Sequence, residues 1–162
     1  MAGADVPRAV WHTSFTVADL ERSERFYVDG LGLVVVHRQE QRGGYTSRLV
    51  GYPDAHLLVL QLAIPGAETG PSGHHLELVQ YLHPPGDAQQ LRTRDPGTAH
   101  LAFVVDDIDA AADRLKAAGA EFVSAPNRID SGVNAGGATC YFRDPDGVTL
   151  EIVQPPPGRE SR

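Results

Sequence analysis

The chain has 162 residues, of which 41% are hydrophobic and 22% charged, a balance typical of one globular domain and not of a disordered chain. Its formal net charge of −7, without a basic cluster, argues against nucleic acid as a partner. No apolar run approaches the about 18 residues of a membrane span, and the N-terminus lacks the features of a signal peptide. The single cysteine, Cys140, excludes an internal disulfide. We therefore expect a cytoplasmic protein without a membrane partner.

The first half of the chain predicts a strand, a helix and then a series of strands. The segment WHTSFTV at 11–17 alternates between polar and apolar residues, as a half-buried strand does. Asp19 is a suitable N-cap for a helix over about 20–29, because its carboxylate can accept from free N–H groups of the first turn. Further strands are expected near 33–39, 56–63 and 75–81, with an extra or continued strand at 45–50 and a Gly/Pro/Ser-rich loop at 64–74.

The second half predicts the same order of elements. HLAFVV at 100–105 matches the first strand, and Asp106 or Asp107 can cap a helix over 107–118 that ends at Gly119. RDPDG at 143–147 is typical of a tight turn. The remaining strands are expected near 121–124, 137–143 and 148–154.

This order of elements is an internal repeat. When the chain is slid along itself, HTSFTVADLERSERFY aligns with HLAFVVDDIDAAADRL, which pairs His12 with His100. Near the end of each half, LELVQ and LEIVQ pair Glu77 with Glu151. We therefore predict one α+β domain over 1–162, made of two tandem βαβββ modules, 8–82 and 98–155, joined by a linker at 83–97.

The repeated glutamates predict a metal site. Strand alternation places Glu77 and Glu151 opposite their aliphatic neighbours, on the sheet face that His12 and His100 share. A buried carboxylate without a partner is costly and tends to protonate. Any one of these residues alone is typical of a structural role, but their repetition at equivalent positions favours one divalent cation. Two imidazoles and two carboxylates suit Zn, Ni, Co, Mn or ferrous Fe.

Four segments resemble the vicinal oxygen chelate superfamily, which includes glyoxalase I, methylmalonyl-CoA epimerase, extradiol dioxygenases, fosfomycin-resistance enzymes and bleomycin-binding proteins. They are HTSFTVADLERSERFYVDGLGL, HLELVQY, GTAHLAFVVDDIDAAADRLKAAGAEF and YFRDPDGVTLEIVQ, and together they cover nearly all of the chain from Trp11 to Gln154. The resemblance implies a curved mixed sheet around a central metal or ligand cavity. By position, it also implies that His12, Glu77, His100 and Glu151 are the metal ligands.

The resemblance separates the members of this superfamily by their ligand sets. Bleomycin-binding proteins generally lack the set, and extradiol dioxygenases leave without a ligand the position that Glu77 fills here, so the pattern favours isomerases and epimerases. Two departures argue against a direct transfer of either named activity. Thr16 stands where glyoxalase I has the arginine that holds glutathione, and Glu77 stands where the epimerase typically has glutamine.

We therefore expect a divalent-metal-dependent isomerase, epimerase or lyase of the glyoxalase-like class. It would act on a small oxygen-chelating metabolite through a metal-stabilised enediolate, with Glu151 or Glu77 as the catalytic base. One alternative is an antibiotic- or natural-product-binding resistance protein, and another is a ring-cleaving dioxygenase that uses ferrous iron. The resemblance also implies a homodimer, in which the modules pair within one chain or across two.

Several other residues are weaker candidates for the substrate pocket. Arg143 offers a cation to an anionic substrate, and His75 shares the predicted face of Glu77. Trp11 and Tyr45 are aromatic residues near strand ends, where such residues more often belong to the core.

Overall fold

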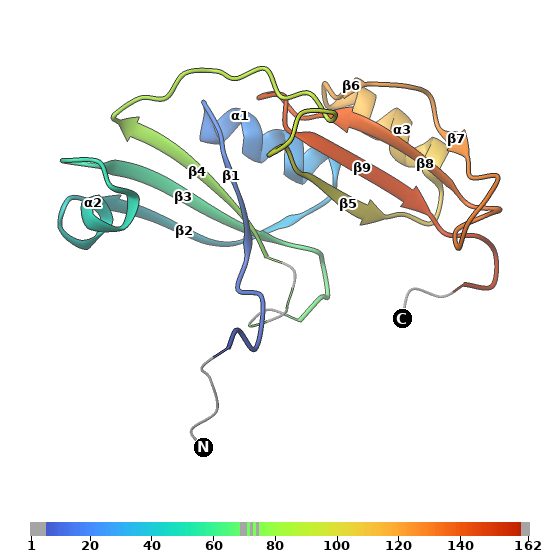
Figure 1. The fold of residues 1–162 in the computed structure, drawn as a ribbon, viewed down its shortest axis with the longest axis horizontal. Coiled ribbons are helices and arrows are strands. Elements are labelled where there is room, and N and C mark those ends of the chain that lie inside the picture. The colour runs from blue at the N-terminus through green and yellow to red at the C-terminus, as the bar shows by residue number, and fades with distance from the viewer. Residues whose placement is uncertain (1–5, 69–70, 72, 74, 160–162) are drawn as a thin grey trace. The chain divides into compact units, whose positions relative to one another are not determined.

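The protein is described here by a computed structural model that covers residues 6–68, 71, 73 and 75–159, so residues 69, 70, 72 and 74 of the expected 64–74 loop lie outside the description. The chain divides into two compact units (Figure 1). Unit 1 comprises Met1–Leu20 and Gly32–Gly86, and unit 2 comprises Glu21–Leu31 and Asp87–Arg162. The elements in chain order are β1 Thr13–Thr16, α1 Leu20–Arg25, the π-helix η1 Phe26–Gly30, β2 Val34–Arg42, α2 Gly44–Val50, β3 His56–Ala63, β4 His75–His83, β5 His100–Val104, α3 Ile108–Ala117, β6 Glu121–Phe122, β7 Asn127–Arg128, β8 Ala138–Arg143 and β9 Thr149–Gln154.

Unit 1 is built on a four-stranded mixed sheet in the order β1-β4-β3-β2. β1 runs parallel to β4, and the other neighbours are antiparallel. The register places Ser14 beside Glu77 on one side and Gln61 beside Glu77 on the other. The opposite face of the sheet is aliphatic and buried, and its central residues are Leu60, Leu62, Leu76 and Leu78.

Unit 2 repeats this topology in the order β5-β9-β8-β6, with the short strand β7 paired to β8. Again the first strand, β5, runs parallel to the last, β9. Helix α3 lies along one face of this sheet (Figure 1). Leu115 of α3 is fully buried, as are Leu150 and Ile152 of β9, and burying each such side chain contributes about 1.5–3 kcal/mol to folding.

The predicted α+β class and the repeated strand–helix–strands order are confirmed by these two mixed sheets. The strand expected at 45–50 is wrong, because Gly44–Val50 forms helix α2. Gly43 and Gly44 have φ angles of 46° and 51°, which end β2, and Gly51 at φ 77° closes the helix in the left-handed conformation. The short strand β7 was not expected; it lies between the segments expected as strands near 121–124 and 137–143 and pairs with β8.

The last residue of each repeated pentapeptide is a glutamine whose side chain caps the N-terminus of a helix. The side-chain oxygen Oε1 of Gln80 accepts from the backbone N–H of Leu20 at 3.0 Å, and that of Gln154 accepts from Ile108 at 3.0 Å. Asp107 caps the second helix further, as its sequence position predicts. The strand that carries the glutamate on one face therefore fixes a helix with the glutamine on the other. Of the helices in the described ranges, none has the length and apolarity that crossing a bilayer requires.

Candidate metal-binding residues

Unit 1 brings two of the four predicted ligands together. His12 directly precedes β1, and its Nε2 lies 3.7 Å from Oε1 of Glu77 on β4. The Glu77 side chain is 15% exposed, so it is largely shielded from water without being sealed off. The amide of Gln61 on β3 donates to Oε2 of Glu77 at 3.3 Å. This hydrogen bond restricts the carboxylate on the side away from His12.

Unit 2 brings the other two together in the same way. His100 begins β5, and its Nε2 lies 3.3 Å from Oε2 of Glu151 on β9. The Thr139 hydroxyl on β8 donates to Oε1 of Glu151 at 2.5 Å. Tyr141 is the β8 neighbour of Glu151, and its ring centre lies 5.2 Å from that of His100. Burial, together with the charge of Glu151, raises the pKa of the Tyr141 phenol, so this side chain is a neutral neighbour of the pair at pH 7.

Each pair is compatible with binding one cation. Two ligand atoms about 2.0–2.2 Å from the same tetrahedral ion lie about 3.4 Å from each other. The observed nitrogen–oxygen distances of 3.7 Å and 3.3 Å are close to this spacing. In addition, Nδ1 of His12 is buried without a hydrogen-bond partner among the described residues. In the part of the chain that the structure describes, such side chains gather in pairs and not in groups of three or more.

The weaker candidates lie in different surroundings. His75 shares the Glu77 face, and its Nε2 is buried with no hydrogen-bond partner within the described ranges. Trp11 and Tyr45 are 65% and 59% exposed. Arg143 is engaged elsewhere, because its Nη1 donates to the carbonyls of Leu91 at 2.5 Å and Gly147 at 2.9 Å.

Sequence reasoning missed the residues that support the two glutamates. Gln61 and Thr139 stand on neighbouring strands, and only the strand register brings them to Glu77 and Glu151. No spacing in the sequence encodes that register. The glutamines that cap the helices did carry a signal, because they end both copies of the repeated pentapeptide.

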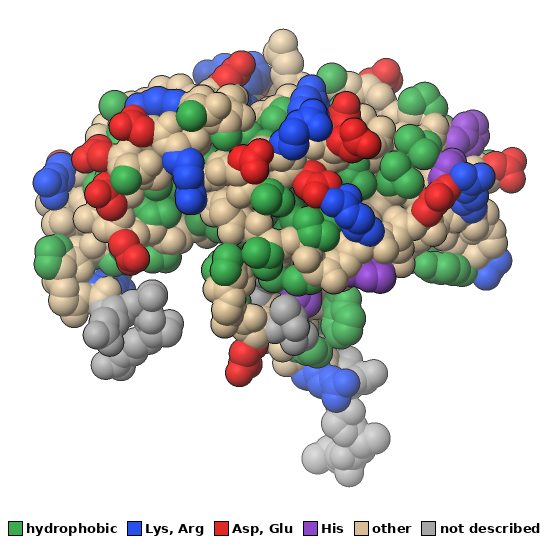
Figure 2. Space-filling view, turned by 180° about the vertical axis from the view of Figure 1, so that it is seen from behind, with side chains coloured by type: hydrophobic (Ala, Val, Ile, Leu, Met, Phe, Trp, Pro, Cys, Tyr) green, Lys and Arg blue, Asp and Glu red, His purple; other side chains and the backbone are tan. Residues whose placement is uncertain are grey.

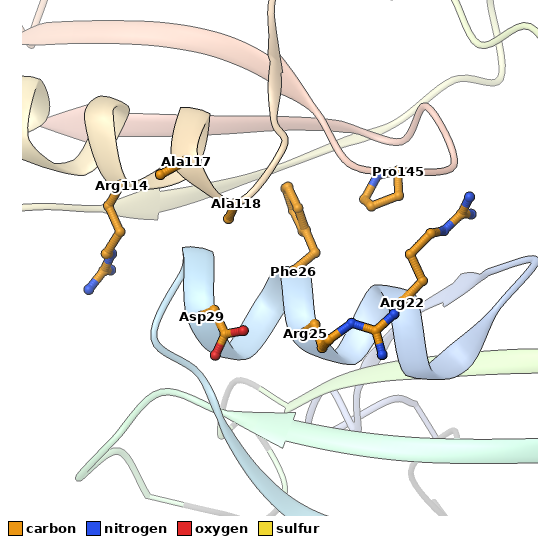
Figure 3. Close-up of a pocket in the computed structure, with 8 residues that line it drawn as sticks. All are labelled: Arg22, Arg25, Phe26, Asp29, Arg114, Ala117, Ala118 and Pro145. Atoms are coloured by element: carbon orange, nitrogen blue, oxygen red, sulfur yellow. The ribbon is translucent and has the colours of Figure 1, made fainter.

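A cavity of about 360 Å³ lies elsewhere in unit 2, between the α1–η1 segment and α3 (Figure 3). Its lining includes three arginines, Arg22, Arg25 and Arg114, whose guanidinium groups point in different directions (Figure 3). Arg22 is paired with Asp146 at 2.6 Å. None of the predicted ligands lines this cavity. On the face of the molecule that Figure 2 shows, acidic and basic side chains are interspersed.

Both the sequence and the fold are similar to those of known proteins. The model of the glyoxalase/bleomycin resistance protein/dioxygenase superfamily matches residues 9–152. A glyoxalase family protein from Bacillus cereus has a similar structure, with a TM-score of 0.79 at 22% identity over 96% of this chain and 99% of that one.

Two relatives with similar sequences are named after an enzymatic activity. A 2-epi-5-epi-valiolone epimerase from an Actinomyces species is 32% identical over 98% of this chain and 86% of its own length. A probable lactoylglutathione lyase from Vibrio parahaemolyticus is 30% identical over 90% of this chain and 89% of its own. The names of both relatives denote the isomerase or lyase type of chemistry.

Proposed function

Because this chain belongs to the glyoxalase/bleomycin resistance protein/dioxygenase superfamily, we propose that it is a divalent-metal-dependent isomerase, epimerase or lyase. Its substrate would be a small metabolite with two neighbouring oxygens, such as a 2-hydroxy ketone. The observation that carries this proposal is the duplicated histidine–glutamate pair, with Nε2 to carboxylate distances of 3.7 Å for His12 and 3.3 Å for His100. The epimerase and lyase names of the relatives support the same type of reaction.

In this proposal His12, Glu77, His100 and Glu151 hold one ion, which is Zn, Ni, Co, Mn or Fe by the chemistry of the donor set. When bound, the ion supplies a Lewis acid that stabilises the negative charge developing on the substrate oxygens as a proton leaves the adjacent carbon. Gln61 and Thr139 orient the two carboxylates through their hydrogen bonds. The sheet strands hold both glutamates at fixed positions, which lowers the cost of bringing them to the substrate.

A carboxylate oxygen must accept the proton, and Glu77 and Glu151 are the candidates for this role. General-base action typically contributes about 10²–10⁴-fold to the rate. A glutamate that acts as the base therefore loses this factor when it is replaced by glutamine, whose amide cannot accept the proton.

The test is exchange of the substrate's α-proton with D₂O, followed by NMR on the metal-loaded protein and on the variants Glu77→Gln and Glu151→Gln. We expect the exchange rate of one variant to fall by about 10²–10⁴-fold, while its metal content per chain equals that of the unaltered protein. Unchanged exchange in both variants, with metal retained, contradicts proton transfer by either glutamate.

A further inference from the structure

The face of the unit 1 sheet that carries Glu77, here named the Glu77 face, is nearly free of charge. By the strand register, this face carries every second residue of β4, which are His75, Glu77, Val79 and Tyr81, and the residues of β1, β3 and β2 that pair in rows with them. Among the described strand positions of this face, Glu77 is the only carboxylate, and lysine and arginine are absent. Its hydrogen-bonding groups other than His37 and His75 are amides and hydroxyls, from Ser14, Thr16, Gln39, Gln41, Gln61 and Tyr81.

Strand β2 separates charged from uncharged side chains between its two faces. Gln39 and Gln41 pair with Val59 and Leu57 on the Glu77 face and are half-buried. The charged residues between and beside them point the other way and are exposed. There Glu40 accepts from Nε of Arg42 at 2.7 Å, and its carboxylate contacts His56 at the same distance. The charges of this strand therefore lie on the face away from Glu77.

An anionic substrate would meet an unfavourable surface here. Proteins usually bind phosphate and carboxylate groups with arginine or lysine, and a desolvated anion without such a partner is costly. Glu77 would also repel it. On the equivalent face of unit 2, Arg143 already donates to two backbone carbonyls. A surface of this composition disfavours phosphorylated and carboxylated substrates.

A substrate with many hydroxyl groups would meet a complementary surface. Each amide and hydroxyl of the Glu77 face can donate and accept, as the hydroxyl groups of a polyol do. Beside them, Leu57, Val59 and Val79 form a buried apolar cluster with Val50 and Tyr81 packed against it. This cluster is buried, so the amides and hydroxyls of the Glu77 face, and not the cluster, are the groups offered to a substrate.

We infer that the site selects an uncharged polyhydroxylated carbonyl compound over its anionic counterparts, with Gln39, Gln41 and Gln61 as the specificity-determining residues. The inference rests on the proposed function, because it names the substrate class of the same site. Gln61 binds the carboxylate of Glu77, so Gln39 and Gln41 are the residues to alter without disturbing the ligands.

The test compares fructose with fructose 6-phosphate, two 2-hydroxy ketones that differ in the phosphate group. Metal content is measured first, and binding of each sugar to the metal-loaded full-length chain is then measured by calorimetry. We expect fructose to bind at least about tenfold tighter than the phosphate ester. The variant Gln39→Lys should shift this ratio at least about tenfold toward the ester, because it adds a cation to the Glu77 face.

The matched control is Thr13→Lys, which adds the same charge to β1 on the face opposite Ser14, and it should leave the ratio unchanged. Equal or tighter binding of the phosphate ester by the unaltered chain overturns the inference, and so does binding of neither sugar by chain that holds its metal. An unchanged ratio in Gln39→Lys overturns the assigned role of this residue. Failure to bind metal is the separate result that contradicts the proposed function.

Discussion

The two histidine–glutamate pairs show how one motif can be supported in two ways. In unit 2 the Thr139 hydroxyl reaches Glu151 at 2.5 Å, and His100 lies 3.3 Å from the same carboxylate. In unit 1 the Gln61 amide reaches Glu77 at 3.3 Å, and the corresponding His12 distance is 3.7 Å. Duplication thus preserved the pair itself, while the residues that support it diverged. Glu151 is the more firmly held carboxylate of the two.

The segments that precede the two glutamate-bearing strands, β9 and β4, differ as well. β9 follows a braced turn, in which the Asp144 carboxylate accepts from the backbone N–H groups of Asp146 at 2.9 Å and Val148 at 2.8 Å. Tyr27 of η1 donates to the other oxygen of Asp144 at 2.9 Å. β4 instead follows the longer 64–74 segment. The hydrogen bonds of Asp144 therefore help to fix the strand that carries the glutamate of unit 2.

The largest difference between the two units is expected in metal affinity, when Thr139 or Gln61, which support the two glutamates, is replaced. Replacing a group that orients a metal ligand typically costs about 10–100-fold in metal affinity. Thr139→Val should reach this range, because it removes the shorter hydrogen bond and keeps the shape of the side chain. Gln61→Leu should cost less. Competition with a metal chelator measures both affinities, and an equal or larger loss in Gln61→Leu would show that Glu151 is not the more firmly held carboxylate.

The hydrogen bond between Tyr27 and Asp144 should make the free energy of unfolding fall at alkaline pH. Burial, and secondarily the charge of Asp144, raises the pKa of Tyr27 well above its usual value of 10.0. Above pH 10 the unfolded chain therefore loses a proton that the folded chain retains, and stability falls by about 1.4 kcal/mol per pH unit until the folded pKa is reached. Tyr27→Phe should flatten this decline in urea-unfolding curves between pH 9 and 11, while the same substitution at the exposed Tyr45 should not.

The smallest effect is expected at the helix starts, where the two units are most alike. Gln80→Ala and Gln154→Ala should each lower the free energy of unfolding by about 1 kcal/mol, because each leaves a helical N–H without its acceptor. Glutamate at either position keeps a side-chain oxygen and should restore most of the loss. Chemical denaturation measures all four variants. If alanine is as stable as glutamine at both positions, the glutamines do not fix the helices.

Much of this architecture could be predicted because the sequence contains an internal repeat. The alignment of His12 with His100 and of Glu77 with Glu151 predicted the same order of elements in both halves of the sequence, and the alternation of side chains assigned the faces of the strands. Helix α2 was missed because GYTSRLV is too short for a helical period to be recognised, and the glycines that bound it act through their backbone conformation. The supports of the two glutamates were missed because strand register depends on pairing between distant segments.

The central claim is that the four residues His12, Glu77, His100 and Glu151 bind one divalent ion. Elemental analysis of protein purified without a histidine tag, alongside a His100→Ala variant, tests it most directly. We predict about one divalent ion per chain in the unaltered protein and its loss in the variant, with both proteins folded by circular dichroism. Absence of metal from both samples, even after reconstitution, would contradict the claim and favour a protein that binds its small-molecule ligand without metal.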